Sequence, residues 1–492
     1  MLVRALLLAA LLSPAAATAQ SFEEALATAY RSHPRLLAER QRVIEADETW
    51  FQARAQGRLS AAFDLQVVPT FVRIPNDAFG PVVVDPDEPP VLLDGTSTEF
   101  ITTRQGGVQV IQPVYQGGRI GALKDQAKAG VLAARAVLEG TEQDILVAAA
   151  DAYANLRRAE EAARIRRNNV SVILRQREAA DARFEVGVGT RTDTAQAEAR
   201  VAQARIGLAQ ADAELAAARA AFESAVGIPP ATLQPVPRFA IPATVVEAIP
   251  VARVANPSLI AAAYGVEAAE ANIDVARSGN KPQVSLNGQL GFIRQGLGGL
   301  QRAETVSVTG QVTIPFAQGG AVKSRVRQAK AARNRAQFEL RDAERQIMEA
   351  VRQLYAQLEA ANTTVAAAQT AVTSAETAFE GVELERDVGT RTALDVLDAE
   401  QEVLNARLAV IDAELARDRA TFQLLALLGA FDADSLALPV VTYAADAHFR
   451  DIKDDGYARL SRNPVVESVD DARDWTVDLI GPPMERPDTL PD

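Results

Sequence analysis

Four short segments alternate apolar and polar residues with a period of two, as β-strands do. The clearest alternation lies in residues 283–290 and 306–314, and weaker alternation lies in 59–67 and 105–114. It puts apolar side chains on one face and Ser, Thr, Asn and Gln on the other. The runs are roughly 9–11 residues long, the length of a tilted membrane strand. A half-buried strand in an ordinary sheet alternates in the same way, so the pattern alone leaves both interpretations open.

Two much longer segments contain no proline and consist mainly of Ala, Glu, Gln, Arg and Leu. They cover residues 118–186 and 320–388, and these residue types favour helix. A single helix of about 69 residues would be about 100 Å long, which exceeds any globular core. Helices of this length pack as coiled coils or tubular bundles. Composition does not distinguish a solvated coiled-coil stalk from the wall of a tube.

The two halves of the chain repeat the same motifs in the same order. Gly189-Thr190-Arg191-Thr192 recurs as Gly389-Thr390-Arg391-Thr392, and the Gln-Gly-Gly at 116–118 recurs at 318–320. Each half therefore predicts a helix such as Ser21 to Gln56, a β-hairpin, a very long helix, a turn and a further long helix. The predicted boundaries are 20–230 for the first repeat (hairpin about 59–114, long helices about 118–227) and 251–430 for the second (hairpin about 283–315, long helices about 320–428).

Three further segments lie outside the repeats. Residues 1–19 combine a basic start, an apolar run and an Ala-Thr-Ala cleavage signal, so they predict a signal peptide and a mature chain that begins at Gln20. The proline-rich residues 231–250 are expected to link the repeats. Residues 431–492 carry 14 acidic and 6 basic residues, and this excess of charge predicts an acidic, largely disordered periplasmic tail.

Composition excludes several classes of site. The chain has no cysteine and a net charge of −13, which argues against a thiolate metal site, a thiol nucleophile, a lipid-anchored N-terminus and a nucleic-acid partner. The only histidines are His33 and His448. His33 precedes Pro34, so a turn or cap role is favoured over a ligand role. No phosphate-binding loop or Gly-x-Ser-x-Gly motif occurs, and we expect neither an enzyme nor a cofactor.

The Gly-Thr-Arg-Thr motifs mark the turns after the long helices. Gly189 and Gly389 are candidates for left-handed residues that end a helix, and Thr192 and Thr392 are candidates to cap the next one. Thr392-x-x-Asp395 fits a capping box, which gives Asp395 a purely structural interpretation. Asp395 and Asp398 also share a helix face. In a symmetric oligomer they would form a ring of carboxylates that attracts cations.

The sequence resembles the TolC family of outer-membrane channel-tunnels over nearly all of the mature chain up to Ala430. The resemblance rests on the duplicated plan, on Ser-Phe-Glu-Glu-Ala-Leu at 21–26, on a proline before each Gln-Gly-Gly turn, and above all on residues 388–399. It implies a mainly α fold with a small β-barrel part: a homotrimer whose twelve-stranded outer-membrane barrel, four strands from each chain, continues as a periplasmic α-helical barrel.

The resemblance also implies partners and site residues. The partners are a periplasmic adaptor (membrane fusion) protein, an inner-membrane ABC or RND transporter, and the lipid of the outer membrane. A periplasmic gate with a cation-selective ring would contain Arg391, Asp395 and Asp398. The helix tips that meet the adaptor are Gly189, Thr190, Arg191, Thr192, Gly389, Thr390 and Thr392. Two positions depart from the family: Arg386 replaces a gate tyrosine, and Ala195 replaces an aspartate for which the nearby Asp193 is a candidate substitute.

The function that follows is an outer-membrane exit duct of a tripartite export system. Such a duct conducts proteins (type I secretion), small toxic compounds, or both, and residues 443–451 resemble the tail of members that serve type I secretion. The alternative is a soluble periplasmic coiled-coil adaptor or scaffold protein. The duplicated amphipathic hairpins argue against that alternative.

Overall fold

A computed structural model describes residues 20–75, 96–297 and 299–454. The predicted signal peptide and the tail beyond residue 454 lie outside the described residues. The chain divides into two units, Met1–Tyr443 and Ala444–Asp492. The described part of the second unit contains the short helix α9 (Ala447–Asp454). The description below concerns the first unit.

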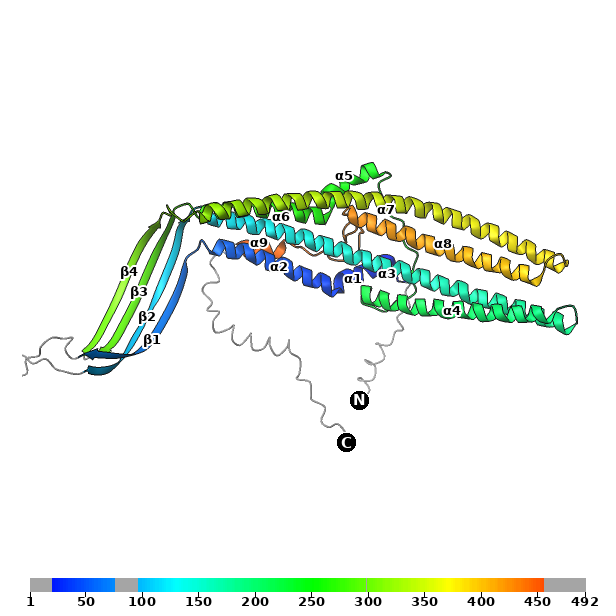
Figure 1. The fold of residues 1–492 in the computed structure, drawn as a ribbon, viewed down its shortest axis with the longest axis horizontal. Helices are drawn as coiled ribbons and strands as arrows, with labels where there is room; N and C mark the ends of the chain where they lie inside the picture. The colour runs from blue at the N-terminus through cyan, green and yellow to red at the C-terminus, as the bar shows by residue number, and fades with distance from the viewer. Residues whose placement is uncertain (1–19, 76–95, 298, 455–492) are drawn as a thin grey trace, which may run out of the picture. The chain divides into compact units, whose positions relative to one another are not determined.

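The first unit consists of long helices and a single four-stranded sheet (Figure 1). The elements are α1 (Phe22–Ser32), α2 (Pro34–Ala55), β1 (Ser60–Pro75), β2 (Thr96–Gln116), α3 (Arg119–Glu185), α4 (Arg191–Val226), α5 (Val245–Ala255), α6 (Pro257–Ser278), β3 (Gln283–Leu297), β4 (Gly299–Thr313), α7 (Ala321–Asp387) and α8 (Ala393–Leu427). The two longest helices, α3 and α7, have 67 residues each.

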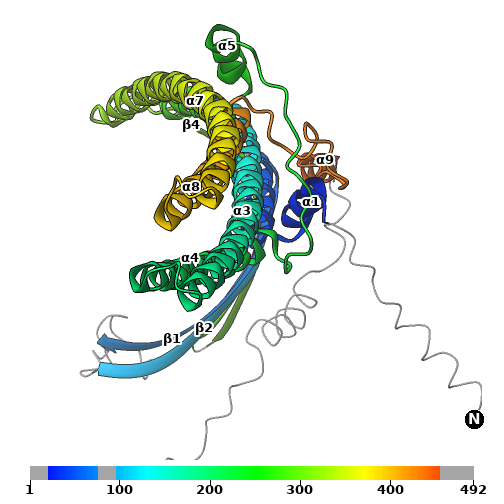
Figure 2. The ribbon, with the colours of Figure 1, turned by 90° about the vertical axis from the view of Figure 1, so that its right-hand side faces the viewer.

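The helices other than α1, α5 and α9 form one curved layer (Figure 2). Near the strands α3 packs against α2 and α6, and α6 packs against α7; farther away α3 packs against α4 and α8, and α8 packs against α7. The chain passes directly from α2 into β1, from β2 into α3, from α6 into β3 and from β4 into α7. The sheet order β1-β2-β3-β4 is therefore the helix order α2-α3-α6-α7. Among the described helices, none is by itself both long and apolar enough to cross a membrane; α5 and α6 meet that test only together, as a pair bent by 45°.

The sheet has an apolar and a polar face, as the alternation predicts. The antiparallel register places Phe63, Val108, Leu290 and Val306 in one row across all four strands. Their exposed fractions are 65%, 37%, 54% and 77%, so no described residue covers this face. The next row, on the opposite face, is Ala62, Gln109, Gln289 and Ser307. Among the described residues no further strand pairs with β1 or β4, so both edges of the sheet are open.

The predicted single helix from Ser21 to Gln56 is wrong, because the helix is interrupted at His33. Pro34 has no N–H to donate and disfavours helical backbone at the residue before it. The His33 ring accepts a hydrogen bond from Arg35 N at 3.3 Å and caps α2, which confirms the cap role. Asn256 caps α6 in the same way in the second repeat.

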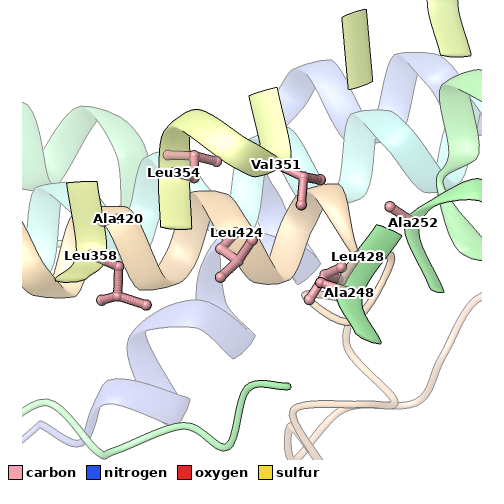
Figure 3. Close-up of a cluster of buried hydrophobic side chains, with 8 residues drawn as sticks. All are labelled: Ala248, Ala252, Val351, Leu354, Leu358, Ala420, Leu424 and Leu428. Atoms are coloured by element: carbon pink, nitrogen blue, oxygen red, sulfur yellow. The ribbon is translucent and has the colours of Figure 1, made fainter. Parts of the chain in front are cut away.

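Helix α5 begins inside the predicted proline-rich linker, so the linker is shorter than expected. Thr244 caps α5, and Pro250 lies within the helix. One face of α5 packs against α7 and α8 (Figure 3), and this burial favours helix over an extended linker. The buried cluster consists of Ala248, Ala252, Val351, Leu354, Leu358, Ala420, Leu424 and Leu428.

A second core lies where α1 packs on the convex side of the curved layer (Figure 2). Six aromatic rings meet there with centroids 5.3–6.2 Å apart: Phe22, Tyr153, Phe222, Phe239, Phe422 and Phe431. The Tyr153 hydroxyl donates to the carbonyls of Gln20 (3.0 Å) and Gln234 (2.9 Å), and burial raises the pKa of Tyr153 to about 12. Phe431 is fully buried, so the start of the tail is packed, while the residues beyond 454, where disorder is expected, lie outside the described residues.

Residues 431–443, which we name the C-terminal strap, lie against α1, α2 and α3. Glu142 accepts a hydrogen bond from the strap at Ala433 N (2.9 Å), and the Tyr30 hydroxyl accepts one from Tyr443 N (2.9 Å). The Arg40 guanidinium lies 4.7 Å from the Tyr30 ring centroid and 5.2 Å from that of Tyr443. Cation–π contacts on both rings tie the strap to α1 and α2.

Strap packing is expected to weaken as the pH rises. Burial, and then the nearby Asp432, raise the pKa of Glu139. Burial also raises the pKa of Glu142; the hydrogen bond from Ala433 N and the charge of Arg40 oppose the rise, and Asp432 and Asp434 add to it. A carboxyl whose pKa is raised by packing binds its proton more tightly when the strap is packed, so packing gains as pH falls through that pKa and loses above it. Limited proteolysis should therefore cut the strap faster at pH 8 than at pH 5.

The variant Glu139→Gln is the matched test, because Glu139 carries the effect without the hydrogen bond that Glu142 makes. The protease should cut the strap of this variant more slowly than that of the parent at pH 8, and the cutting rate should depend less on pH. Equal rates at the two pH values in the parent protein would contradict the account.

Candidate functional site at the helix tips

The Gly-Thr-Arg-Thr motif lies at different positions in the two turns at the ends of the long helices. Helices α3 and α7 begin 202 residues apart, at 119 and 321, and have the same length. The Gly-Thr-Arg-Thr motifs that follow are only 200 residues apart, at 189 and 389. The turns between the helices have the same length, residues 186–190 and 388–392, so the motif lies two residues later in the first turn and its residues have different roles in the two turns.

In the second turn the predicted geometry is confirmed. Gly389 has φ +83° and ends α7, and Thr392 is the N-cap of α8. Thr392 N and Oγ1 each donate to Asp395 Oδ2 at 2.8 Å, and Asp395 N donates to Thr392 Oγ1 at 3.2 Å. These hydrogen bonds lower the pKa of Asp395, so the carboxylate stays charged. The capping-box interpretation of Asp395 is correct.

In the first turn two predictions are wrong. The left-handed residue that ends α3 is Gly187 (φ +80°) and not Gly189, and the N-cap of α4 is Thr190 and not Thr192. Thr190 forms the capping box with Asp193, whose Oδ2 accepts from Thr190 N at 2.9 Å. A capping box needs its acidic residue three positions after the cap. That spacing selects Thr190 here and Thr392 in the second turn.

This difference predicts unequal effects for the two threonines of the first turn. Thr190→Ala removes the side-chain cap and should cost about 1 kcal/mol of local helix stability. Thr192→Ala should leave the cap intact and change little. Hydrogen exchange at the first turn of α4, followed by mass spectrometry, measures both. Faster exchange in Thr192→Ala than in Thr190→Ala would contradict the assignment.

The three predicted gate residues lie at one tip but do not bind one another within the chain. Arg391 Nε donates to Glu385 Oε2 at 2.8 Å, and this bond, with the charges of Glu385 and Asp395, raises the pKa of Arg391. Asp398 Oδ1 instead accepts from Arg200 Nη2 at 2.6 Å. The predicted adaptor-contact residues lie on the two turns, where Thr190, Arg191, Thr192, Gly389, Thr390 and Thr392 are exposed and Gly189 is half-buried.

The contacts that join the two helical hairpins near the tip were not anticipated. Arg200 of α4 reaches Asp398 of α8, and Arg386 Nη1 of α7 donates to Gln176 Oε1 of α3 at 3.0 Å. An apolar cluster of Ile173, Val201, Ala204 and Leu397 lies between the hairpins. Arg386, the residue that departs from the family's tyrosine, therefore links two neighbouring helices through its long side chain. No local spacing rule pairs residues about 200 positions apart, so the sequence carried no usable signal.

A further arginine joins three helices farther from the tip. Arg158 of α3 donates through Nε to Asp412 of α8 (2.7 Å) and through Nη1 to Glu214 of α4 (2.8 Å). The sequence Asp-Ala-Glu-Leu-Ala occurs in both repeats, at 212–216 and 412–416. Arg158 binds its glutamate in the first repeat and its aspartate in the second. Within the described ranges no group of three or more His, Asp or Glu side chains is placed to hold a metal ion.

Comparison with known proteins identifies a family for this chain. Residues 87–228 and 248–430 match the outer membrane efflux protein family. The chain is 30% identical over 360 residues to outer membrane efflux protein BepC of Brucella suis, and the aligned region covers 73% of this chain and 79% of BepC. It is 28% identical over 213 residues to alkaline protease secretion protein AprF of Pseudomonas aeruginosa, and the aligned region covers 42% of this chain and 44% of AprF.

The fold has close counterparts among solved structures. CusC, described as forming a transmembrane channel, superposes with a TM-score of 0.71 at 17% identity, over 84% of this chain and 92% of CusC. At this identity the likeness concerns the fold alone. The family match covers most of both repeats and includes both tips. The chain therefore belongs to the outer membrane efflux protein family of TolC-like channels, and it is located in the outer membrane with a helical portion in the periplasm.

Proposed function

We propose that three copies of this chain form an outer-membrane exit duct. The observation that carries the proposal is the single curved layer in which four helices continue, in the same order, as four strands with two open edges. An exposed sheet edge calls for a partner strand, and backbone groups inside a membrane must all be paired. Three copies joined edge to edge would give a closed barrel of twelve strands, continued by a helical tunnel.

The two faces of the sheet support this arrangement. The apolar row at Phe63, Val108, Leu290 and Val306 would face lipid, and the polar row at Gln109, Gln289 and Ser307 would face the channel. The strands have 15–21 residues, which is longer than the roughly 9–11 residues needed to cross the bilayer. A soluble adaptor or scaffold, the alternative, would leave this apolar face in water.

The cargo and partners are proposed from the relatives. BepC is named for efflux and AprF for the secretion of a protease, so both small toxic compounds and proteins are candidate cargo. The duct would receive cargo from a periplasmic adaptor and an inner-membrane ABC or RND transporter. The exposed turns around Thr190 and Thr390 would contact the adaptor.

The periplasmic tip is proposed to be the gate. In a trimer Asp395 and Asp398 would place six carboxylates around the tunnel mouth, and Arg391 would brace the turn through Glu385. Opening would separate the α7–α8 hairpin from the α3–α4 hairpin. The link between Arg200 and Asp398 would then break, because it joins the two hairpins.

A planar bilayer tests the carboxylate ring. The variant Asp395→Asn with Asp398→Asn should lower the preference for cations and weaken block by multivalent cations by about tenfold, because the ring loses its charge. The control Glu198→Gln with Glu402→Gln removes the same charge from exposed positions of α4 and α8 farther from the turns. If the aspartate variant keeps the parent's selectivity and block, the ring assignment is wrong.

A further inference from the structure

The junction between helices and strands is basic in an otherwise acidic protein. The chain passes through this junction four times, at residues 51–59, 114–124, 277–284 and 314–327. These ranges contain nine basic residues and no acidic one, although the whole chain has a net charge of −13. The basic residues are Arg54, Arg58, Arg119, Lys124, Arg277, Lys281, Lys323, Arg325 and Arg327.

A cleft of about 610 Å³ lies at this junction, between the start of α3, the end of α6 and the start of α7. Figure 1 shows these helix ends meeting beside the strands. The lining contains no carboxylate. Its polar side chains are Arg119, Asn272, Ser278, Gln283, Arg325 and Gln328. Guanidinium, amide and hydroxyl groups are donors, so the lining suits an anion with several oxygen atoms.

The cations at the cleft lack carboxylate partners. Arg119, Lys281 and Arg325 are exposed, and none of them forms an ion pair with a carboxylate of the described residues. Lys281 lies against the turn before α3, where Gly117 and Gly118 have φ +63° and +82°. A Cβ at Gly117 would lie only 2.7 Å from Lys281 Cβ. The glycine therefore makes room for the lysine, which places its Nζ beside the start of α3.

The cleft shares one lining residue with the polar face of the sheet. Gln283 lines it, and Gln283 alternates along β3 with Ser285, Asn287 and Gln289. That face would line the channel in the function proposed above, on which this step rests. In a symmetric assembly the cleft would recur in each chain and form a basic zone between the helical and stranded parts.

We infer that this cleft is an anion-binding site in the channel wall. Its ligands are soluble anions with several oxygens, such as phosphate or sulfate groups on the cargo. Arg119 and Arg325 line the site together with the amides of Asn272 and Gln283, and Lys281 adds a third charge beside the cleft, at Gly118. Six or more lumenal cations at one level would also reduce the exclusion of anions that the acidic tip imposes.

Titration with inorganic pyrophosphate tests the site directly. The detergent-solubilised mature protein should bind it saturably at one site per chain, measured by calorimetry at low salt. Arg119→Gln with Arg325→Gln should weaken binding at least tenfold, on the order expected for losing charge-assisted hydrogen bonds. The control Lys124→Gln with Lys128→Gln removes the same charge from α3 outside the cleft and should leave binding unchanged. No saturable binding, or equal loss in both variants, would overturn the site.

A bilayer measurement separates this inference from the channel function. The arginine variant should raise the cation-to-anion permeability ratio on the order of threefold, and the lysine control should raise it less. A conducting channel whose ratio is unchanged in the arginine variant would contradict the site while leaving the duct intact. A protein that forms no channel would contradict the duct, and the pyrophosphate titration would still decide the binding site.

Discussion

Replacing Arg200 and Arg386 with alanine is expected to raise the ratio of open to closed channels, and with it the mean conductance of the resting channel, by about thirtyfold. Arg200 binds Asp398 at 2.6 Å and Arg386 binds Gln176 at 3.0 Å, and each bond joins the first repeat to the second near the tip. Losing two charge-assisted bonds of this kind costs about 2 kcal/mol after allowance for solvent exposure. If those bonds act mainly in the closed tip, the closed-to-open equilibrium shifts by that amount.

The control for this variant is Arg205→Ala with Arg352→Ala. It removes the same charges from exposed positions on the same two helices, α4 and α7, where neither arginine forms an ion pair with the described residues. Single-channel recording should show the parent's low conductance in the control. The charge exchange Arg200→Asp with Asp398→Arg should restore part of the closure. Parent-like conductance in the Arg200 and Arg386 variant would show that these bonds do not hold the tip closed.

Truncating Phe422 to alanine is expected to destabilise the helical part by about 3–5 kcal/mol, the usual cost of removing a buried aromatic ring. Phe422 is fully buried. Its ring stacks on Phe22 at 5.6 Å and contacts Phe239 and Phe431 at 6.0 and 5.6 Å. It therefore joins α8 to the N-terminal helix, the linker and the strap. Thermal denaturation followed by circular dichroism should show a lower midpoint and a lower yield of folded protein.

Phe184 supplies the matched control, because its side chain is 46% exposed near the end of α3. Phe184→Ala should cost less than about 1 kcal/mol. A Phe422 variant as stable as the Phe184 variant would mean that the aromatic cluster does not hold these segments together. The strap should also become more sensitive to protease in Phe422→Ala, since Phe431 loses its neighbour.

The periodic features of the fold could be predicted from the sequence. Alternation identified the strands, and the absence of proline identified α3 and α7, because both signals repeat over many residues. His33 was interpreted correctly as a cap because a proline follows it. The helix break beside His33 was missed, although Pro34 marks it. Helix α5 was missed because it is short and Pro242 and Pro250 lie before and within it. Its packing on α7 and α8 stabilises the helix, and the sequence alone does not show that packing.

The tips show where a repeated motif misleads. Both turns contain Gly-Thr-Arg-Thr, yet Thr190 caps one helix and Thr392 caps the other. The choice depends on an aspartate three residues after the cap, at Asp193 or Asp395, and this spacing was visible in the sequence. The partners of Asp398 and Arg386 were not visible, because they come from the other repeat and depend on how two hairpins pack.

The central claim is that three copies of the chain form one duct in the outer membrane. The direct measurement is the mass of the mature protein, extracted from outer membranes in mild detergent and analysed by light scattering with the detergent contribution removed. The expected protein mass is three times that of one mature chain, found in the outer-membrane fraction. A monomer or dimer released with the soluble periplasmic proteins would contradict it and would favour an adaptor or scaffold.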